Sequence, residues 1–428
     1  MDDEFELGRD HAQRRDDSTD VMVRDRFYLP DDLYLDGNSL GPLSTDAEES
    51  LEHVLDEWRE LGIRGWTDGD PSWFHYGERL GERLAPMVGA REDEVVVANS
   101  TTINIHTLVG TFLDRCAREE RGQKVVVNDL DFPTDHYAIR SQLQTRGLDP
   151  DEHLIVVESH DGRTIDESNI EAALDAHDDV GIVFMPSVLY RSGQLFDIES
   201  ITDVAHEHDA YAGFDLAHSA GVIPHSLADD GVDFAVWCHY KYLNAGPGAI
   251  AGLYVHSDYH GETPALAGWW GHDKETQFEM RTTYTPAQSA GAWQTGTIPV
   301  LSAAPLLGVF DIVDDVGIER LREQSLALTD YFMYLVDERL PECSVGTPRD
   351  RSRRGGHVAI EHEEAYRITE ALKERGVVGD FRPPNVVRLC PSPLYVGFED
   401  VWNAVEHLRE IIDGREYEQF ADRDGGVT

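Results

Sequence analysis

Two short stretches decide the fold class: YAGFDLAH at residues 211–218 and FAVWCHYKYLNAG at residues 234–246. Each opens with a run of apolar and β-branched residues that is typical of a buried strand, and then turns polar. Asp215 closes the first run, and Lys241 follows the second run by four residues. Because ligands of open α/β sheets bind beyond the carboxyl ends of the strands, this carboxylate and this amine can face each other across a ligand.

Further runs of the same kind lie on both sides of these stretches. The predicted strands lie at 95–98, 124–128, 154–157, 181–185, 211–215, 234–237 and 249–255. Helical spacing of apolar residues separates several of them, as at 103–113 and 198–208. Alternation of strands and helices predicts an α/β fold with a large, doubly wound, mostly parallel sheet.

After about residue 310 the pattern changes to that of a smaller α+β domain. Helices are predicted at 317–340, 363–375 and 399–412, and strands at 357–360 and 385–389. We expect a flexible acidic arm at residues 1–26 and a segment at 27–60 that packs with the small domain. We expect the large, cofactor-binding domain to span residues 61–310 and the small domain to span residues 311–428.

The charge balance excludes several classes of partner. The 36 basic and 82 acidic residues give a net charge of −46, spread along the whole chain. Such a surface repels nucleic acid and anionic membranes, and it indicates a halophilic organism in which salt screens the self-repulsion. The acidic N-terminus does not resemble a signal peptide, and no apolar run is long enough to span a bilayer. The four cysteines form no CxxC pair, so we expect reduced thiols and a cytoplasmic protein.

Lysine is rare, with four residues against 32 arginines. Lys124, Lys274 and Lys373 have no distinctive neighbours, whereas Lys241 follows an apolar run and Tyr240. A lysine in a desolvated niche can react with a carbonyl group as a neutral amine. Lys241 together with Asp215 therefore predicts pyridoxal 5'-phosphate (PLP), whose pyridine nitrogen needs a carboxylate partner.

Other polar clusters follow the neighbouring strands and are expected at the same edge of the sheet. Thr101 and Thr102 open a helix, where free N–H groups favour a phosphate, and Phe132 offers a flat face to a ring. Taken alone, the threonines could form an N-cap, Asp215 could cap a helix, and Phe132 could belong to the core. No HExxH or Cys–His metal-binding spacing is present, so we predict no metal site. The chain also has no P-loop pattern and no G-x-S-x-G pattern of a serine hydrolase.

Several longer motifs then point to a family. They are LDGNSLG at 35–41, FPTDHY at 132–137, GFDLAH at 213–218, YKYLNAG at 240–246, GWWGH at 268–272 and PNVVR at 384–388. In these motifs, from about residue 33 to residue 405, the chain resembles the kynureninase family. Its members are PLP enzymes of fold type I in the class V aminotransferase-like group. His239 is a departure, because we expect a small hydroxyl residue before Tyr240.

The resemblance implies a role for each matching residue. Lys241 holds the cofactor and, once released, acts as a base, while Tyr240 touches the phosphate and takes part in proton transfer. Arg388 binds the α-carboxylate of the substrate, and Ser39 and Trp58 lie near the aromatic ring of the substrate. The remaining implied cofactor contacts are Thr101, Thr102, Phe132, Asp135, Asp215, His218, Trp269 and Thr297. Trp269 and Thr297 resemble contacts made by the other subunit, which implies a homodimer.

The implied reaction is PLP-dependent hydrolysis of L-kynurenine, of 3-hydroxykynurenine, or of both. The products are anthranilate or 3-hydroxyanthranilate and L-alanine, in tryptophan catabolism and the kynurenine pathway toward NAD biosynthesis. One alternative is another class V PLP enzyme, such as an aminotransferase or a cysteine desulfurase. Cys343 and Cys390 are the candidate desulfurase cysteines, but neither lies in a desulfurase-like motif. A non-catalytic metabolite-binding protein is a further alternative, against which Lys241, Asp215 and Arg388 together argue.

Overall fold

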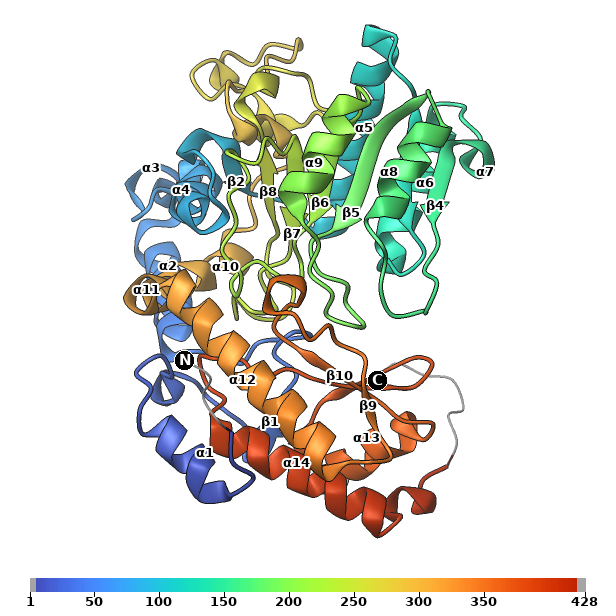
Figure 1. Cartoon of the computed structure of the whole chain (residues 1–428). Helices are drawn as coiled ribbons and strands as arrows, with labels where there is room; N and C mark the ends of the chain where they lie inside the picture. Colours follow the sequence, from blue (N-terminus) through green and yellow to red (C-terminus); the bar gives the residue numbers. More distant parts are fainter. Residues whose placement is uncertain (1–4, 422–428) are drawn as a thin grey trace.

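A seven-stranded sheet forms the centre of the larger domain (Figure 1). The computed structural model describes residues 5–421. Along the sheet the strands follow the order β2 (Val95–Val97), β8 (Gly252–Val255), β7 (Phe234–Trp237), β6 (Tyr211–Asp215), β5 (Val180–Pro186), β3 (Lys124–Asn128) and β4 (Leu154–Val157). All pairs from β7 to β4 are parallel, and β8 runs antiparallel to both of its neighbours. The predicted mostly parallel sheet is confirmed.

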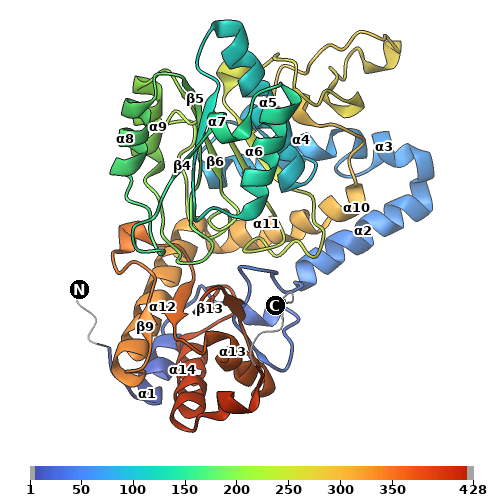
Figure 2. The same ribbon diagram turned by 90° about the vertical axis from the view of Figure 1, so that its right-hand side faces the viewer.

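Helices cover both faces of this sheet, as Figure 2 shows from the side. Val125 and Val127 pack toward α5 (Thr101–Glu119) and α6 (Pro133–Thr145), whereas Val126 points into the core that contains α8 (Ser168–Ala176) and α9 (Ile198–Glu207). Successive side chains of a strand point to opposite faces, so a strand covered on both sides is apolar throughout. This is why the predicted strands appear in the sequence as unbroken apolar runs.

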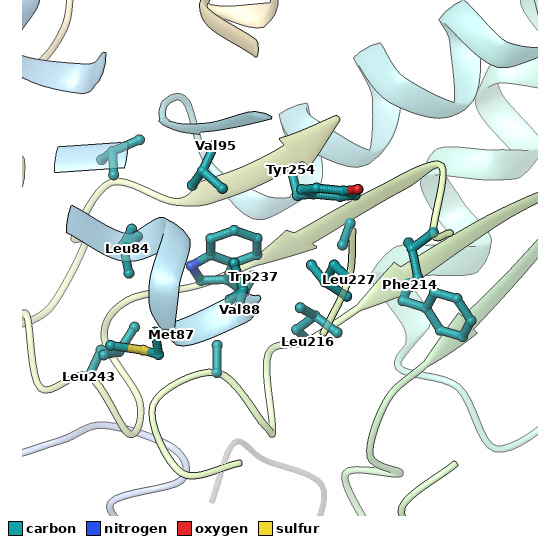
Figure 3. Packing of buried hydrophobic residues seen from close by; sticks show 14 of the residues in the cluster. Leu84, Met87, Val88, Val95, Phe214, Leu216, Leu227, Trp237, Leu243 and Tyr254 are labelled. Carbon is teal, nitrogen blue, oxygen red and sulfur yellow. The ribbon is translucent and has the colours of Figure 1, made fainter. Parts of the chain in front are cut away.

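The strand that leads to Lys241 is anchored by close packing. Trp237 is fully buried beside α4 (Tyr76–Leu84) and the turn that follows it (Figure 3). Its ring lies so close to Gly252 of β8 that a Cβ there would come within 2.3 Å of it. On the next strand, a Cβ at Gly213 would come within 2.2 Å of the Phe234 ring. Glycine at these two positions lets large aromatic rings lie flat against the neighbouring strand.

The smaller domain is an α+β unit with its own core. Its antiparallel sheet has the order β12 (Asp380–Arg382), β13 (Val386–Leu389), β10 (Val358–Glu361) and β9 (Ser344–Val345). It packs against α12 (Ile318–Arg339), α13 (Ala365–Glu374) and α14 (Phe398–Asp413). The predicted helices and the two longer strands lie within two residues of these bounds. Strands β9 and β12 have only two and three residues and are not among the predicted strands.

The expected flexible arm at residues 1–26 is wrong for its central part. Arg9–Asp16 form helix α1, which packs on α14 and buries Ala12. The Asp16 carboxylate accepts hydrogen bonds from the backbone N–H groups of Phe398 (2.7 Å) and Glu399 (2.9 Å), the first residues of α14. Tertiary contacts thus stabilise a helix that its charged sequence does not predict. Residues 1–4 of the arm lie outside the described residues.

The segment at 27–60 joins the two domains rather than packing with the small one alone. Strand β1 (Leu33–Tyr34) pairs in parallel with β11 (Val377–Val378) of the small domain. Helix α2 (Thr45–Leu61) instead packs on α11 (Pro305–Val316) in the large core. Gly317, with φ of 88°, separates α11 from α12, so the expected boundary at residue 310 falls inside α11. The short helices α3 (Gly65–Asp68), α7 (Pro150–His153) and α10 (Val300–Ala303) complete the set.

No helix among residues 5–421 combines the length and the apolar character that a bilayer crossing requires.

Candidate active site

A pocket of about 330 Å³ lies between the carboxyl ends of the sheet strands and the small domain. It brings together most of the residues singled out from the sequence. Its lining consists of Asn38, Ser39, Thr101, Thr102, Phe132, Thr134, Tyr190, Asp215, Ala217, His218, Cys238, Tyr240, Lys241, Arg382 and Arg388.

Lys241 reaches the centre of this group from the loop after β7. Its Nζ lies 3.0 Å from Nε2 of His218, in the loop after β6. Burial and the nearby Lys241 charge lower the pKa of His218 well below its ordinary value, so the imidazole is neutral. A neutral ring can accept a hydrogen bond from the lysine amine at Nε2, which places the proton of the ring on Nδ1.

The N-terminal segment holds the Lys241 loop in place. Gly41 donates its N–H to the Tyr240 carbonyl oxygen at 2.7 Å. A Cβ at Gly41 would lie 2.5 Å from the Lys241 carbonyl oxygen and 2.1 Å from Oδ1 of Asn244. The LDGNSLG motif therefore packs directly against the backbone of Lys241.

Three carboxylates gather behind Lys241. Asp131, Asp135 and Asp215 are all buried, and both carboxylate oxygens of Asp135 have no hydrogen-bond partner among residues 5–421. Burial and the two neighbouring carboxylates raise the pKa of Asp135 well above its ordinary value. Burial likewise raises the pKa of Asp215, while Lys241 acts in the opposite direction. Buried carboxylates so close together are stabilised by a cation or a proton donor between them.

Threonines gather at the amino end of α5. Thr101 and Thr102 form its first turn, and Oγ1 of Thr102 lies 2.8 Å from Oγ1 of Thr134, at the start of α6. The N–H groups of a first helical turn have no intrahelical acceptors, and the helix dipole favours an anion there. This part of the pocket suits a phosphate.

These groups fit PLP. Lys241 can take the aldehyde, and the Asp215 and Asp135 carboxylates can face a protonated pyridine ring. The threonines at α5 can hold the phosphate, and Phe132 lies at the pocket with an exposed face beside Tyr190. The unpartnered carboxylate oxygens of Asp135 are the observation that argues most directly for a missing polar group.

Tyr240 and Cys238 lie together at the same pocket. Burial raises the pKa of the Tyr240 hydroxyl above its ordinary value, and the neighbouring Cys238 thiol adds to this shift. Burial also raises the pKa of Cys238, so both groups are protonated near neutral pH. Tyr240 therefore keeps its proton and can donate a hydrogen bond at the pocket.

His239, the departure noted in the sequence, turns away from the pocket. Its Nε2 accepts a hydrogen bond from Nε1 of Trp237 at 2.9 Å, and its Nδ1 lies 2.5 Å from the Ile250 carbonyl oxygen. His239 is fully buried and ties β7 to the segment before β8. It is a core residue and does not replace the expected hydroxyl.

Arg388 reaches the pocket from β13, fully buried. Asp380 occupies one side of its guanidinium, accepting from Nε at 2.8 Å and also from Nη2. Nη2 donates to Oγ of Ser39 at 2.8 Å, and Nη1 donates to the Tyr190 carbonyl oxygen at 2.6 Å. The two-pronged face expected for a substrate carboxylate is thus taken by Asp380.

Four predicted residues do not line this pocket: Asp135, which belongs to the adjoining carboxylate cluster, and Trp58, Thr297 and Trp269. Trp58 and Thr297 line a separate apolar cavity of about 650 Å³, together with Ile63 and Leu301. Trp58 is 59% exposed, which does not support the expected substrate contact within its own chain. Trp269 is 42% exposed and packs edge-on against Phe278.

Lys241 differs from the other lysines in its surroundings. Lys124, Lys274 and Lys373 are each paired with a carboxylate, that of Asp179, Glu78 and Glu370 respectively. The described residues give Lys241 an imidazole as its close neighbour instead.

Arg382, Asp380 and Cys238 are not among the predicted site residues. Arg382 and Asp380 belong to β12, which is too short to be recognised. Arg382 lines the pocket only because the small domain folds against the large one, and Asp380 contacts it through its ion pairs with Arg382 and Arg388. Tyr190 and Thr134 follow predicted strands, and their position beyond β5 and β3 is the signal that could have selected them.

Comparison with known proteins identifies the family. A kynureninase from Geobacillus thermodenitrificans is 50% identical over 401 residues, covering 93% of this chain and 92% of the relative. A kynureninase from Shouchella clausii is 47% identical and covers 96% of each chain. The chain belongs to the kynureninase family. The model of the kynureninase C-terminal domain matches residues 321–408, which include Asp380 and Arg388.

The fold is shared more widely than the family. An apo cysteine desulfurase from Thermococcus onnurineus superposes with a TM-score of 0.77 at 19% identity, covering 92% of this chain and 98% of that chain. A C-DES variant with glycine covalently linked to its PLP cofactor gives 0.77 at 17% identity, covering 90% and 99%. At such low identity these likenesses describe the fold, which this member of the kynureninase family shares.

Proposed function

We propose that the chain hydrolyses L-kynurenine, 3-hydroxykynurenine or both, with PLP bound at Lys241. The products are anthranilate or 3-hydroxyanthranilate and L-alanine. One observation carries the proposal: Lys241, Asp215 and Arg388 line one pocket in a chain that is 50% identical to a kynureninase over nearly its full length. The breakdown of tryptophan, with a route toward NAD, is the metabolic setting that we propose.

In this proposal the large domain holds the cofactor. Thr101 and Thr102 bind the phosphate, Phe132 stacks on the ring, Asp215 pairs with the pyridine nitrogen, and Asp135 and His218 lie beside the ring. When bound, PLP supplies an electron-accepting ring that stabilises negative charge on the substrate.

The proton transfers fall to Lys241 and Tyr240. Once the substrate amine has replaced it, Lys241 removes the proton from Cα. Water adds to the γ-ketone, and the protonated Tyr240 hydroxyl assists this step. The Cβ–Cγ bond then breaks, and the former carbonyl carbon leaves as the carboxylate carbon of anthranilate. Cβ gains a proton to become a methyl group, and Lys241 returns a proton to Cα, which gives L-alanine.

In this proposal the substrate carboxylate binds at the small domain, near Arg388, and Ser39 lies near the aromatic ring of the substrate. We also propose a homodimer in which Trp269 and Thr297 reach the phosphate of the neighbouring subunit, and Trp58 reaches its substrate. The exposure of Trp58, of Ile63 (81%) and of Leu301 (43%) around one apolar cavity supports this assembly. Sedimentation at the mass of two chains is the expected result.

A cysteine desulfurase or aminotransferase activity is less well supported. Burial raises the pKa of Cys343 to about 12 and that of Cys390 to about 12, so neither thiol is nucleophilic at neutral pH. Neither cysteine lines the Lys241 pocket.

The acidity supports a halophilic, cytoplasmic protein. At about 1 M salt the screening length falls to about 3 Å, which suppresses repulsion across a surface with a net charge of −46. An unfolding midpoint that falls in dilute buffer is the expected result, and an unchanged midpoint would contradict halophilic adaptation.

The test is to mix the protein with PLP and L-kynurenine in concentrated salt and to follow anthranilate fluorescence, with 3-hydroxykynurenine in parallel. We expect product that requires PLP and is lost in Lys241→Ala, together with the absorbance of bound cofactor. Cofactor binding without product from either substrate would retain PLP and reject the reaction. Turnover by Lys241→Ala would reject the role of Lys241.

A further inference from the structure

Arg388 has little capacity left for a substrate. A guanidinium carries five N–H donors. Four of those on Arg388 are already used, two by Asp380 and one each by Ser39 and the Tyr190 carbonyl. Within residues 5–421 a single N–H, on Nη1, is left, which is too few for two parallel hydrogen bonds to a carboxylate.

The positive charge of Arg388 is also already neutralised within the protein. Its guanidinium is buried against the Asp380 carboxylate, so the two together are neutral. Asp36 adds a further negative charge nearby when it is ionised, and burial and Asp380 raise its pKa to about 6. Arg388 with these two carboxylates therefore does not attract an anion.

Arg382 supplies the missing charge. It lines the same pocket, its side chain is 23% exposed, and its guanidinium lies 5.8 Å from the centre of the Tyr190 ring. Its Nε donates to Oδ2 of Asp380 at 3.0 Å and its Nη2 also contacts that oxygen, while Nη1 has no partner among residues 5–421. Ser39 Oγ lies 3.4 Å from Nη2 of Arg382 and 2.8 Å from Nη2 of Arg388, so the two guanidinium groups meet at this hydroxyl.

We propose that Arg382 is a second substrate-binding cation, which Asp380 holds beside Arg388 so that both arginines bind the α-carboxylate of the amino-acid substrate. The proposal rests on the proposed function for the identity of that substrate. Asp380 is a positioning residue, since it orients both arginines and touches no substrate atom itself. With Arg382 present, the two arginines balance Asp36 and Asp380, and the cluster becomes positive when Asp36 takes up a proton. Without Arg382 it is neutral or negative.

The test separates carboxylate binding from folding. Arg382→Ala should raise KM for L-kynurenine about 10- to 100-fold with a much smaller change in kcat, because one charge-assisted interaction is lost. A second ligand is the amine analogue of L-kynurenine, which keeps the amino group and the aromatic ketone but lacks the α-carboxylate. The affinity of Arg382→Ala for this amine analogue should stay unchanged. Arg140→Ala, which removes an exposed arginine paired with Asp151 on α6, is the matched control. If Arg382→Ala does not fold, Arg382→Lys, which keeps the charge and loses the planar fork, should give a smaller increase in KM.

Two results would overturn the proposal. One is an unchanged KM in Arg382→Ala, and the other is an equal loss of affinity for the substrate and for the amine analogue. Binding of L-alanine, followed by the absorbance of the bound cofactor, gives an independent readout. If the protein does not cleave kynurenine at all, the proposed reaction fails, yet weaker L-alanine binding by Arg382→Ala would still support the role of Arg382. Equal L-alanine binding would reject it.

Discussion

Gly41→Ala should damage the active site although Gly41 touches no reacting atom. The added Cβ would lie 2.5 Å from the Lys241 carbonyl oxygen, whereas ordinary contacts begin at 3.4 Å. Either the Lys241 loop or the LDGNSLG segment must therefore shift by roughly 1 Å. Neither can move freely, because Gly41 N–H is bonded to the Tyr240 carbonyl and Ser39 is bonded to Arg388.

The structure also gives the size of the effect. A misplacement of about 1 Å costs roughly 100-fold in rate, which corresponds to about 2.7 kcal/mol of activation free energy. Overpacking against backbone atoms should lower the free energy of unfolding by about 1–3 kcal/mol. Because Lys241 itself is displaced, we expect kcat/KM to fall and cofactor binding to weaken together.

The assay is kcat/KM from anthranilate fluorescence with saturating PLP, and urea unfolding followed by tryptophan fluorescence. Gly8→Ala is the control, because a Cβ at Gly8 meets no atom within 4 Å and its φ of −79° suits alanine. Equal kcat/KM and equal unfolding of Gly41→Ala and Gly8→Ala would show that the LDGNSLG segment does not fix the position of Lys241.

Two further predictions concern carboxylates. Burial raises the pKa of Asp36 to about 6, so the folded state holds this proton more tightly than the unfolded state does. The stabilisation that this proton gives the folded state is complete below about pH 4 and is lost, by up to about 3 kcal/mol, as the pH rises toward 6. Asp36→Asn should therefore flatten the pH dependence of the urea midpoint between these two pH values. An unchanged slope would contradict the shift. Asp16→Ala removes the acceptor of two N–H groups at the start of α14 and should cost about 1 kcal/mol in urea unfolding, whereas the exposed Asp17→Ala should cost almost nothing. Equal effects would show that α1 does not stabilise α14 through this contact.

The sequence predicts the large domain well because its signals are local. The strands β3, β4, β6 and β7 match the predicted bounds, since buried strands of a doubly wound sheet are uniformly apolar. Lys241, Asp215 and Thr101 follow such strands, so the topology alone brings them to one edge.

The rest of the site depends on contacts between distant segments. Arg382 and Asp380 lie on a three-residue strand with no distinctive pattern, and Arg382 reaches the pocket through docking of the small domain. Helix α1 is strongly polar and forms against α14, which follows nearly 400 residues later. The family resemblance implies that Trp58 lies near the substrate ring, but its position in one chain depends on how α2 packs against α11.

The scarcity of lysine has a consequence for how the chain would acquire an aldehyde cofactor. Aldehydes react with any accessible neutral amine, and a lysine-rich surface offers many unproductive sites. Here three of the four lysines are engaged by carboxylates, and one of these, Lys274, is only 11% exposed. Because nearly all of the basic residues are arginines, the aldehyde meets few competing amines. Cofactor binding should therefore approach one aldehyde per chain even when the aldehyde is in excess.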